Sequence, residues 1–291
     1  MPTSRRGVSL IELLIAMTIA VALGGALISL LTSSNRFQER TEAQRAARGV
    51  ARSAVNALVS DLRMVDPEWG VTAASGTSIT VRIPYAMGMV CSTGLTSITA
   101  ALFPVDSVAL SLGGFSGFAT RGSGGAWSIT ESGLSGVTVG SSWPAACTSA
   151  GVQEITAPTS APNARSRPIT ISGTLLPSAT AGTPILLYRR IRYYFGASAQ
   201  TGLSGRTALW RDYLDDGAGA VELAAPFDAS AAFRFYNLNA TSPQTAAPVP
   251  LTDIRGLQLF LPGESDRTAR TRAAPEQADF TTSVFFMNRR S

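Results

Sequence analysis

Glu12 is the residue whose chemistry raises the first question, because it is the one charge in a long apolar stretch. Every other side chain between Val8 and Leu31 is uncharged, and residues 13–35 carry no charge over 23 positions. A carboxylate costs on the order of 2.5–3.5 kcal/mol at the centre of a membrane helix and less near its end. Glu12 is therefore predicted to be a functional residue that needs a cationic partner.

The apolar stretch must position this carboxylate, and its length is that of a membrane span. As a helix, the 23 uncharged residues would extend roughly 34 Å, against a hydrocarbon core of about 30 Å. Leu, Ile, Ala, Val and Met dominate it, and the pair Gly24-Gly25 is tolerated in such helices. Arg5 and Arg6 precede the stretch and predict a cytoplasmic N-terminus. The rest of the chain is then expected on the far side of the membrane.

The composition excludes several catalytic arrangements. All 24 basic residues are Arg, and the sequence has neither Lys nor His. A Walker A loop needs its Lys, a Ser-His-Asp or Cys-His pair needs its His, and a His-ligated zinc site needs the same residue. We therefore expect no enzyme activity, no cofactor, no metal and no small-molecule substrate.

The two cysteines offer a second kind of chemistry. Cys91 and Cys147 both follow the apolar stretch, so they are expected in an oxidising compartment. A disulfide between them would close a 57-residue loop, and the chain-entropy model gives it about 4 kcal/mol of stabilisation. Two free, unrelated thiols are the alternative, because two cysteines give no spacing pattern to check.

The start of the chain resembles the type IV pilin-like proteins. Their signature is a basic leader that ends in Gly, followed by an apolar residue, Ser or Thr, a short apolar pair and Glu. This sequence reads Arg5-Arg6-Gly7-Val8-Ser9-Leu10-Ile11-Glu12, with Val8 where Phe is common. The resemblance implies cleavage after Gly7 by a prepilin peptidase, N-methylation of Val8, and pairing of Glu12 with the terminal amine of a neighbouring subunit. The alternative is a plain membrane anchor with a stray Glu.

Helical periodicity continues beyond the apolar stretch. After Asn35 the apolar residues recur at steps of three and four, while arginines occupy the other faces. The members of this apolar face are Ala47, Val50, Ala51, Ala54, Val55, Leu58 and Leu62. Pro67 is expected to end the helix near Met64 or Val65. A break near Ser33-Ser34, which would give two helices, is the alternative.

From Gly70 onward the apolar period is two, which indicates strands joined by loops rich in Gly, Ser, Thr and Pro. The predicted strands are 79–83, 108–112, 127–130, 136–139, 152–156, 168–172, 185–195, 208–211, 232–236, 254–261 and 280–287. Short connections favour antiparallel pairing. The predicted fold class is α+β: leader 1–7, helix 8–65 with its membrane part at about 8–33, and a β-rich head 66–291.

A looser resemblance covers the whole chain in outline and is weakest over residues 88–167. The order of Asp61-Leu62-Arg63-Met64, Arg192-Tyr193-Tyr194 and Leu209-Trp210-Arg211 is similar to that of the minor pilin W family and of the type II secretion pseudopilin J. It implies a minor subunit that takes part in type IV pilus assembly or initiation, with other pilins and minor pilins, the prepilin peptidase and the membrane as partners. The head would lie in the periplasm and reach the cell surface after assembly. A type II secretion pseudopilin, or an anchored adhesin or DNA-binding domain that never assembles, are the rivals.

Three charged segments are given structural interpretations. Asp212, Asp215 and Asp216 precede Gly217 without EF-hand spacing, so a turn is favoured over calcium binding. Arg189, Arg190 and Arg192 alternate between two faces of a strand, so a solvated arginine face is favoured and no nucleic-acid binding is expected. Residues 262–278 are charged and read as an exposed loop.

Overall fold

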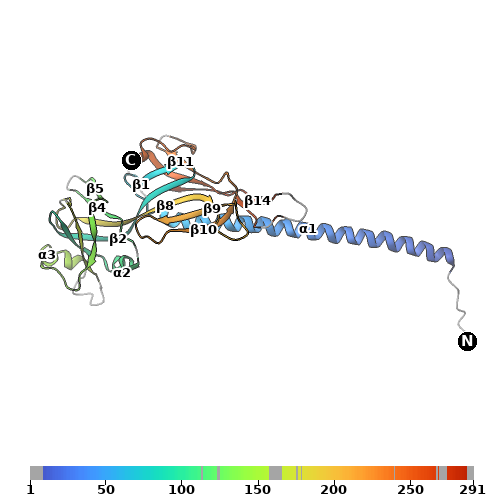
Figure 1. The fold of residues 1–291 in the computed structure, drawn as a ribbon, viewed down its shortest axis with the longest axis horizontal. Coiled ribbons are helices and arrows are strands. Elements are labelled where there is room, and N and C mark those ends of the chain that lie inside the picture. Colours follow the sequence, from blue (N-terminus) through green and yellow to red (C-terminus); the bar gives the residue numbers. More distant parts are fainter. Residues whose placement is uncertain are drawn as a thin grey trace, which may run out of the picture.

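The chain begins with one long helix, α1 (Leu10–Leu62), which runs unbroken for 53 residues, or about 80 Å (Figure 1). No break occurs at Ser33-Ser34. The helix ends at Leu62, and Arg63 follows as its C-cap. Asp66 then accepts the backbone N–H groups of Glu68 and Trp69, and this turn leads into the first strand.

The computed structural model describes residues 9–112, 114–122, 125–156, 166–174, 176–177, 179–238, 240–266, 268 and 274–286. Two antiparallel sheets follow α1. The larger sheet has the strand order β14-β13-β10-β9-β8-β2-β3-β7-β6, with β1 added on β2, β4 on β8, and β5 on β4. The smaller sheet has the order β11-β12-β15. The fold class expected from the sequence, a long helix followed by an antiparallel β-rich head, is confirmed.

The strands of the larger sheet are β1 (Val71–Ser75), β2 (Ser78–Thr93), β3 (Ser97–Leu102), β4 (Gly117–Arg121), β5 (Trp127–Thr130), β6 (Leu134–Val139), β7 (Pro168–Gly173), β8 (Pro184–Ala197), β9 (Thr207–Tyr213), β10 (Ala220–Phe227), β13 (Gly263–Glu264) and β14 (Gln277–Ala278). Those of the smaller sheet are β11 (Ala232–Asn237), β12 (Ile254–Phe260) and β15 (Thr281–Phe285). Short helices complete the head: α2 (Pro104–Leu112), α3 (Ala145–Ser149), α4 (Val152–Thr156) and the 3-10 turn η1 (Leu251–Asp253).

The part of the head next to α1, which we call the proximal lobe, packs both sheets against the helix. It comprises α1 from Ala47 onward, residues 78–83 of β2, residues 189–197 of β8, and β9–β15. Its buried core includes Leu58 and Leu62 of α1, Tyr193 of the larger sheet and Phe233 and Phe235 of the smaller one. Buried helix residues that are spaced three or four positions apart therefore contact buried strand residues that are spaced two positions apart. This is the spacing expected of one face of a helix and one face of a strand.

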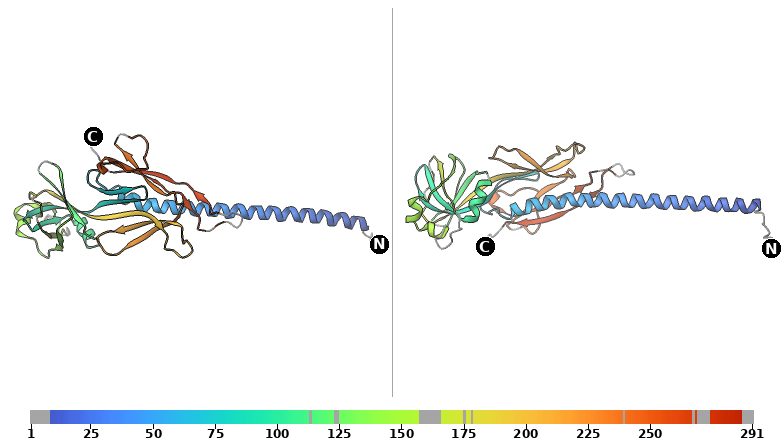
Figure 2. Two further views of the ribbon diagram at one scale, coloured as in Figure 1. Left: turned by 45° about the horizontal axis from the view of Figure 1, so that its top comes forward. Right: turned by 90° about the horizontal axis from the view of Figure 1, so that it is seen from below.

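The distal lobe, residues 86–187, lies at the end of the molecule opposite the N-terminus (Figures 1 and 2). The long strands β2 and β8 pass through both lobes, and their register shifts between Pro84 and Ala86. Beyond that shift, the distal lobe has its own buried cluster, which includes Ile98, Phe118 and Ile171. The larger sheet thus runs through both lobes, and each lobe has its own core.

Two segments that were predicted as strands are helices. Residues 108–112 belong to α2, where Pro104 stands at the N-terminus and Asp106 lies in the first turn, both favourable at a helix start. Residues 152–156 form α4, in which Val152 and Thr156 are both fully buried four positions apart. Over five residues an apolar pattern fits either period, so these two predictions were wrong.

The prediction of an exposed loop over residues 262–278 was wrong at both ends of this segment, while residues 267 and 269–273 lie outside the described residues. Its ends form the antiparallel pair β13–β14, and its carboxylates Glu264 and Glu276 are buried. Arg206 lies beside Glu264, and Arg40 of α1 lies 3.2 Å from Glu276. The charged residues of this segment predicted exposure to solvent, but each of these two carboxylates has an arginine partner that permits its burial.

Candidate assembly site on the N-terminal helix

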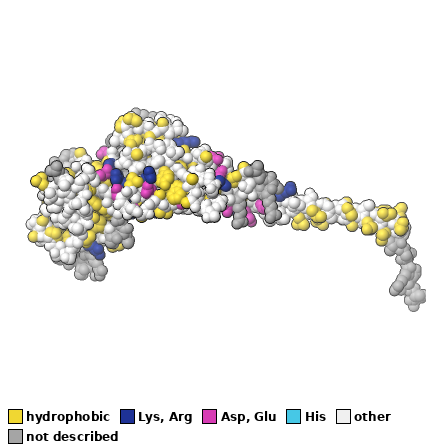
Figure 3. Space-filling model, in the orientation of Figure 1, with side chains coloured by type: hydrophobic (Ala, Val, Ile, Leu, Met, Phe, Trp, Pro, Cys, Tyr) yellow, Lys and Arg dark blue, Asp and Glu magenta, His cyan; other side chains and the backbone are white. Residues whose placement is uncertain are grey.

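The first half of α1 extends away from the head with its apolar side chains uncovered (Figure 3). Fourteen large apolar residues between Leu10 and Phe37 are between 54% and 79% exposed. They occupy every face of the helix, and an all-round apolar helix is one that is buried in a membrane or among other helices. This half is also long and apolar enough to span a membrane. Its surface therefore requires partners that lie outside this chain.

Glu12 lies in the first turn of this exposed half. Ser9 is the N-cap residue, and its backbone N–H donates a hydrogen bond to Oε2 of Glu12 at 3.0 Å. A carboxylate in this position satisfies a free N–H group and complements the positive end of the helix dipole. Within the described part of the chain no ion pair joins Glu12 to an arginine. The cation that the sequence predicts for Glu12 is therefore not among the described arginines. Gly7 and Val8, the predicted cleavage and methylation positions, lie outside the described residues.

The change from bare helix to packed helix occurs between Arg40 and Ala47. Arg40 makes the ion pair with buried Glu276 described above. About two turns further on, Gly263 of β13 approaches the helix so closely that an added Cβ would clash with the carbonyl oxygen of Ala47. From Ala47 onward the helix residues that face the sheets are fully buried. The β13–β14 pair therefore marks the level at which the head begins.

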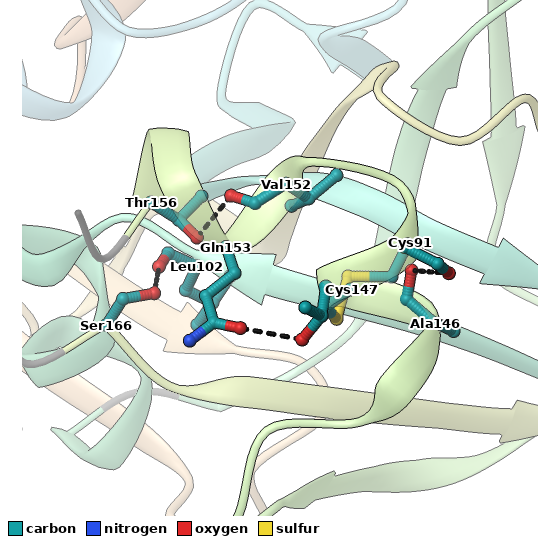
Figure 4. Close-up of a disulfide and its surroundings, with 10 residues drawn as sticks. Cys91, Leu102, Ala146, Cys147, Val152, Gln153, Thr156 and Ser166 are labelled. Carbon is teal, nitrogen blue, oxygen red and sulfur yellow. Dashed lines mark hydrogen bonds between the residues drawn. A yellow bond between two sulfur atoms is a disulfide. The ribbon is translucent and has the colours of Figure 1, made fainter. Parts of the chain in front are cut away.

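The disulfide lies far from this site, in the distal lobe, where Figure 1 labels α3, and Figure 4 shows it in close-up. Cys91 of β2 and Cys147 of α3 are bonded, with their Cα atoms 4.5 Å apart, so the predicted pairing is confirmed. Thr148 donates to Gln153 at 2.7 Å, and Thr156 donates to the carbonyl oxygen of Val152. The bridge therefore attaches the small helices α3 and α4 to the sheet.

The aspartates before Gly217 form turn and ion-pair contacts. Asp212 pairs with Arg192 and Asp215 with Arg190, each at less than 3 Å, while Asp216 accepts the backbone N–H of Ala218. The hydrogen bond from Arg190 holds the pKa of the Asp215 carboxyl below its usual range. No cluster of three metal-binding side chains occurs among the described residues. The turn interpretation agrees with this geometry.

The arginine side chains of β8 make contacts within the chain, and these contacts restrain them more than the predicted solvated face would. Arg190 and Arg192 are held by aspartates, and the guanidinium of Arg189 lies over the rings of Tyr85 and Tyr213 at 5.2 and 5.4 Å. Burial raises the pKa of the Tyr85 phenol to about 12, and Arg189 opposes part of that rise. Pairing of this kind was not visible in the sequence, because the partners come from β2, from β9 and from the turn that follows β9.

One contact that sequence reasoning missed fixes the end of α1. The hydroxyl of Tyr193, on β8, donates a hydrogen bond to Oδ2 of Asp61 in the last turn of the helix. Burial and the adjacent Asp61 carboxylate raise the pKa of this phenol. Only the alternation around Tyr193, which placed it with Ile191 on the core face, could have indicated this contact.

Comparison with known proteins gives one finding, at the N-terminus. Residues 2–28 match the family model described as the prokaryotic N-terminal methylation motif. No curated protein and no solved structure matches the chain. The matched residues contain Gly7, Val8 and Glu12 and extend through most of the bare apolar half of α1. The motif supports a type IV pilin-like protein, with a membrane-anchored and structural character.

Proposed function

We propose that this chain, a type IV pilin-like protein by its N-terminal motif, is a minor subunit that takes part in the assembly or initiation of a type IV pilus in the inner membrane. The observation that carries the proposal is the division of α1. Its first half is apolar on all sides and packs against none of the described residues of the head, while one face of its second half is buried in the head. A shared helical surface of this kind suits a bundle of several different pilins.

The proposed assembly chemistry uses residues of the first turn. Cleavage after Gly7 by the prepilin peptidase frees the amine of Val8, which is then N-methylated. The Glu12 carboxylate, which accepts a hydrogen bond from the Ser9 N–H, then accepts one from the amine of a neighbouring subunit. Two opposite charges in an apolar bundle neutralise each other, so the cost of leaving Glu12 unpaired in the membrane is removed.

The direction of insertion follows from Arg5 and Arg6, which keep the leader on the cytoplasmic side where the peptidase acts. The head then lies in the periplasm, which agrees with a compartment in which Cys91 and Cys147 are oxidised. After assembly the head is carried outward with the filament. Its role is structural, and the proposal gives it no catalytic step.

A minor role is supported by the size of the head. The mature chain has 284 residues (291 minus the 7 of the leader), and some 226 of them, 66–291, follow the helix. A compact domain of that length has a radius of gyration of about 17 Å. Subunits in a tightly wound filament follow one another at a small axial rise, so such heads would crowd one another at every position. Placement at low copy, or at an end, removes that conflict.

Quantitative mass spectrometry on sheared filaments, together with a deletion strain, tests this proposal. We expect the chain at a small fraction of the major pilin and fewer pili on the deletion strain. If the chain is the most abundant pilin, or if its deletion leaves pilus number unchanged, the minor-pilin proposal is wrong. Loss of protein secretion with normal pili would assign the chain to a type II secretion system instead.

A further inference from the structure

The larger sheet has one face on the core of the proximal lobe and the opposite face open. Ile191 and Tyr193 of β8 point into the core. Successive side chains of a strand point to opposite faces, so Arg192 and Tyr194 lie on the open face. Figure 3 shows apolar and charged side chains of both signs gathered on one face of the head.

A pair of aromatic rings occupies this open face. Tyr194 of β8 and Trp210 of β9 stand directly opposite each other in the sheet. Their ring centroids lie 6.2 Å apart and their planes are nearly parallel, at 11°. Both rings lie above Gly196, where an added Cβ would come 3.2 Å from Tyr194 Cε2 and 3.6 Å from Trp210 Cδ1. The glycine thus lets both rings lie close to the backbone.

Contacts within the chain fix both rings in place. The guanidinium of Arg192 lies 4.9 Å from the centre of the Tyr194 ring and covers one face of it. The indole N–H of Trp210 donates to the carbonyl oxygen of Ala197 at 3.2 Å. Trp210 therefore has its one polar group satisfied, and among the described residues Tyr194 is its sole ring or cation partner. We call this set, with its polar neighbours, the Trp210 platform.

Hydrogen-bonding groups of both kinds border the rings. On one side, Arg192 and Asp212 are paired at 2.7 Å. On the other, Glu222 of β10 stands opposite Trp210 and accepts hydrogen bonds from Ser198, from the backbone N–H of Ala199 and from Gln200. Arg192 and Gln200 are exposed. The rim thus offers donors and acceptors within reach of a flat ligand.

The charges around the platform do not favour a polyanion. Arg82, Arg190 and Arg192 are paired with Glu131, Asp215 and Asp212 respectively, and Glu222 adds a further carboxylate. Nucleic acid binds through unpaired Lys and Arg that neutralise phosphates, and this surface has no such excess. The ligand that fits it carries no net charge.

The backbone here does not favour a peptide strand either. The two rings stand on β8 and β9, and each of these strands is paired on both sides: β8 with β2 and β9, and β9 with β8 and β10. An added peptide strand needs a free sheet edge. The partner must therefore be recognised by side chains alone, through a flat apolar face and polar groups at its rim.

We propose that the Trp210 platform binds a neutral oligosaccharide of pyranose units. A pyranose ring presents C–H bonds on its faces and hydroxyl groups at its edge, and each hydroxyl both donates and accepts. The C–H face would stack on the indole, and the edge hydroxyls would meet Arg192, Asp212, Gln200 and Glu222. This binding goes beyond the proposed assembly role and does not depend on it, since a single unassembled chain contains the whole platform.

The test is a titration of the full chain in micelles of a zwitterionic detergent, because glucoside or maltoside detergents would compete. The probes are chitohexaose, cellohexaose and maltohexaose, followed by saturation-transfer NMR and tryptophan fluorescence. We expect saturable binding of at least one of them. Trp210→Ala should weaken that binding by about tenfold or more, as loss of a central aromatic contact does. Trp210→Phe should weaken it less, and Arg192→Gln should weaken it with both rings in place.

Phe285→Ala is the matched control, because Phe285 is an aromatic residue 52% exposed on the other sheet, and its removal should leave binding unchanged. Circular dichroism checks the fold of each variant, and Trp210→Phe and Arg192→Gln decide the matter if Trp210→Ala does not fold. Absence of binding by all three sugars overturns the proposal. So does binding that none of the Trp210 and Arg192 variants weakens, or a heparin oligosaccharide that binds through Trp210 more tightly than the neutral sugars.

Discussion

The two halves of α1 differ in what surrounds them, although both are rich in apolar residues. Leu27, in the first half, is 62% exposed, whereas Leu58, in the second, is fully buried against strands of both sheets. The first half is apolar on every face, and the second is apolar on one face with arginines on the others. The comparison teaches that the second half belongs to the head and that the first half is a surface for other molecules.

The largest expected effect comes from placing the same charge in each half. Leu58→Asp buries an unpaired carboxylate and should lower the free energy of unfolding of the head by about 5 kcal/mol or more. Leu27→Asp should leave the head within about 0.5 kcal/mol of its original stability, because the Leu27 side chain is exposed and packs against none of the described residues of the head. Urea unfolding in micelles, followed by the four tryptophans, all of which lie in the head, measures both. Equal losses in the two variants would contradict the division.

A comparable but more local effect is expected from the disulfide. Replacing Cys91 and Cys147 with Ser removes a cross-link worth about 4 kcal/mol on the chain-entropy model. The loss should appear as faster amide exchange in α3, α4 and the adjoining part of β2, while β11 and β12 of the proximal lobe stay protected. Uniform loss of protection in both lobes would show that the two cores do not behave as separate units.

Glu12→Ala tests the first half without touching the head. Removing the carboxylate should favour membrane insertion by up to about 3 kcal/mol, and less near the helix end, so the variant should still reach the membrane. Its recovery with partner pilins should fall, since the proposed amine contact is lost. Membrane fractionation and co-purification measure the two effects, and Glu12→Gln, which keeps the shape, should behave as Glu12→Ala does. Normal co-purification of both variants would remove the role proposed for this carboxylate.

The smallest expected effect concerns the pH dependence that buried Tyr85 gives to the stability of the head. The pKa of Tyr85 is raised to about 12 in the folded chain, so above pH ~10 the unfolded chain loses this proton first. The free energy of unfolding should therefore fall between pH 10 and pH 12. Tyr85→Phe should make that fall shallower and change the stability at pH 7 by less than about 1 kcal/mol, because the buried hydroxyl has no hydrogen-bond partner among the described residues. An unchanged pH profile in this variant would argue against the burial of Tyr85.

Long elements with strong periodicity could be predicted from the sequence. The 53-residue helix, the core face of β8 with Ile191 and Tyr193, and the pair Phe233 and Phe235 all follow from apolar spacing. The disulfide was predicted because both cysteines were expected in an oxidising compartment and the sequence contains two of them. In each case the information is local or compositional, so one sequence is enough.

The remaining features depend on contacts between distant residues. The helices α2 and α4 span too few residues for their apolar period to be read. Glu276 is buried because it pairs with Arg40, which lies 236 positions away in the sequence and could not be identified as its partner from the sequence. The separation of the head into two cores results from a register shift in β2 and β8, which leaves no mark on the apolar pattern. Similarly, the Trp210 platform depends on which strands neighbour β8.

Photo-crosslinking in cells tests the central claim most directly. A photoreactive amino acid is placed at Leu27 in the bare half of α1 and, as the matched control, at Phe285 on the head. We expect the probe at Leu27 to give adducts with other pilin subunits, and we expect these adducts to disappear when Gly7→Arg blocks cleavage. The probe at Phe285 should give no adducts with the helices of other pilin subunits. If Leu27 crosslinks to no pilin, or if the adducts persist unchanged in the uncut chain, the bare half of α1 is not the assembly surface.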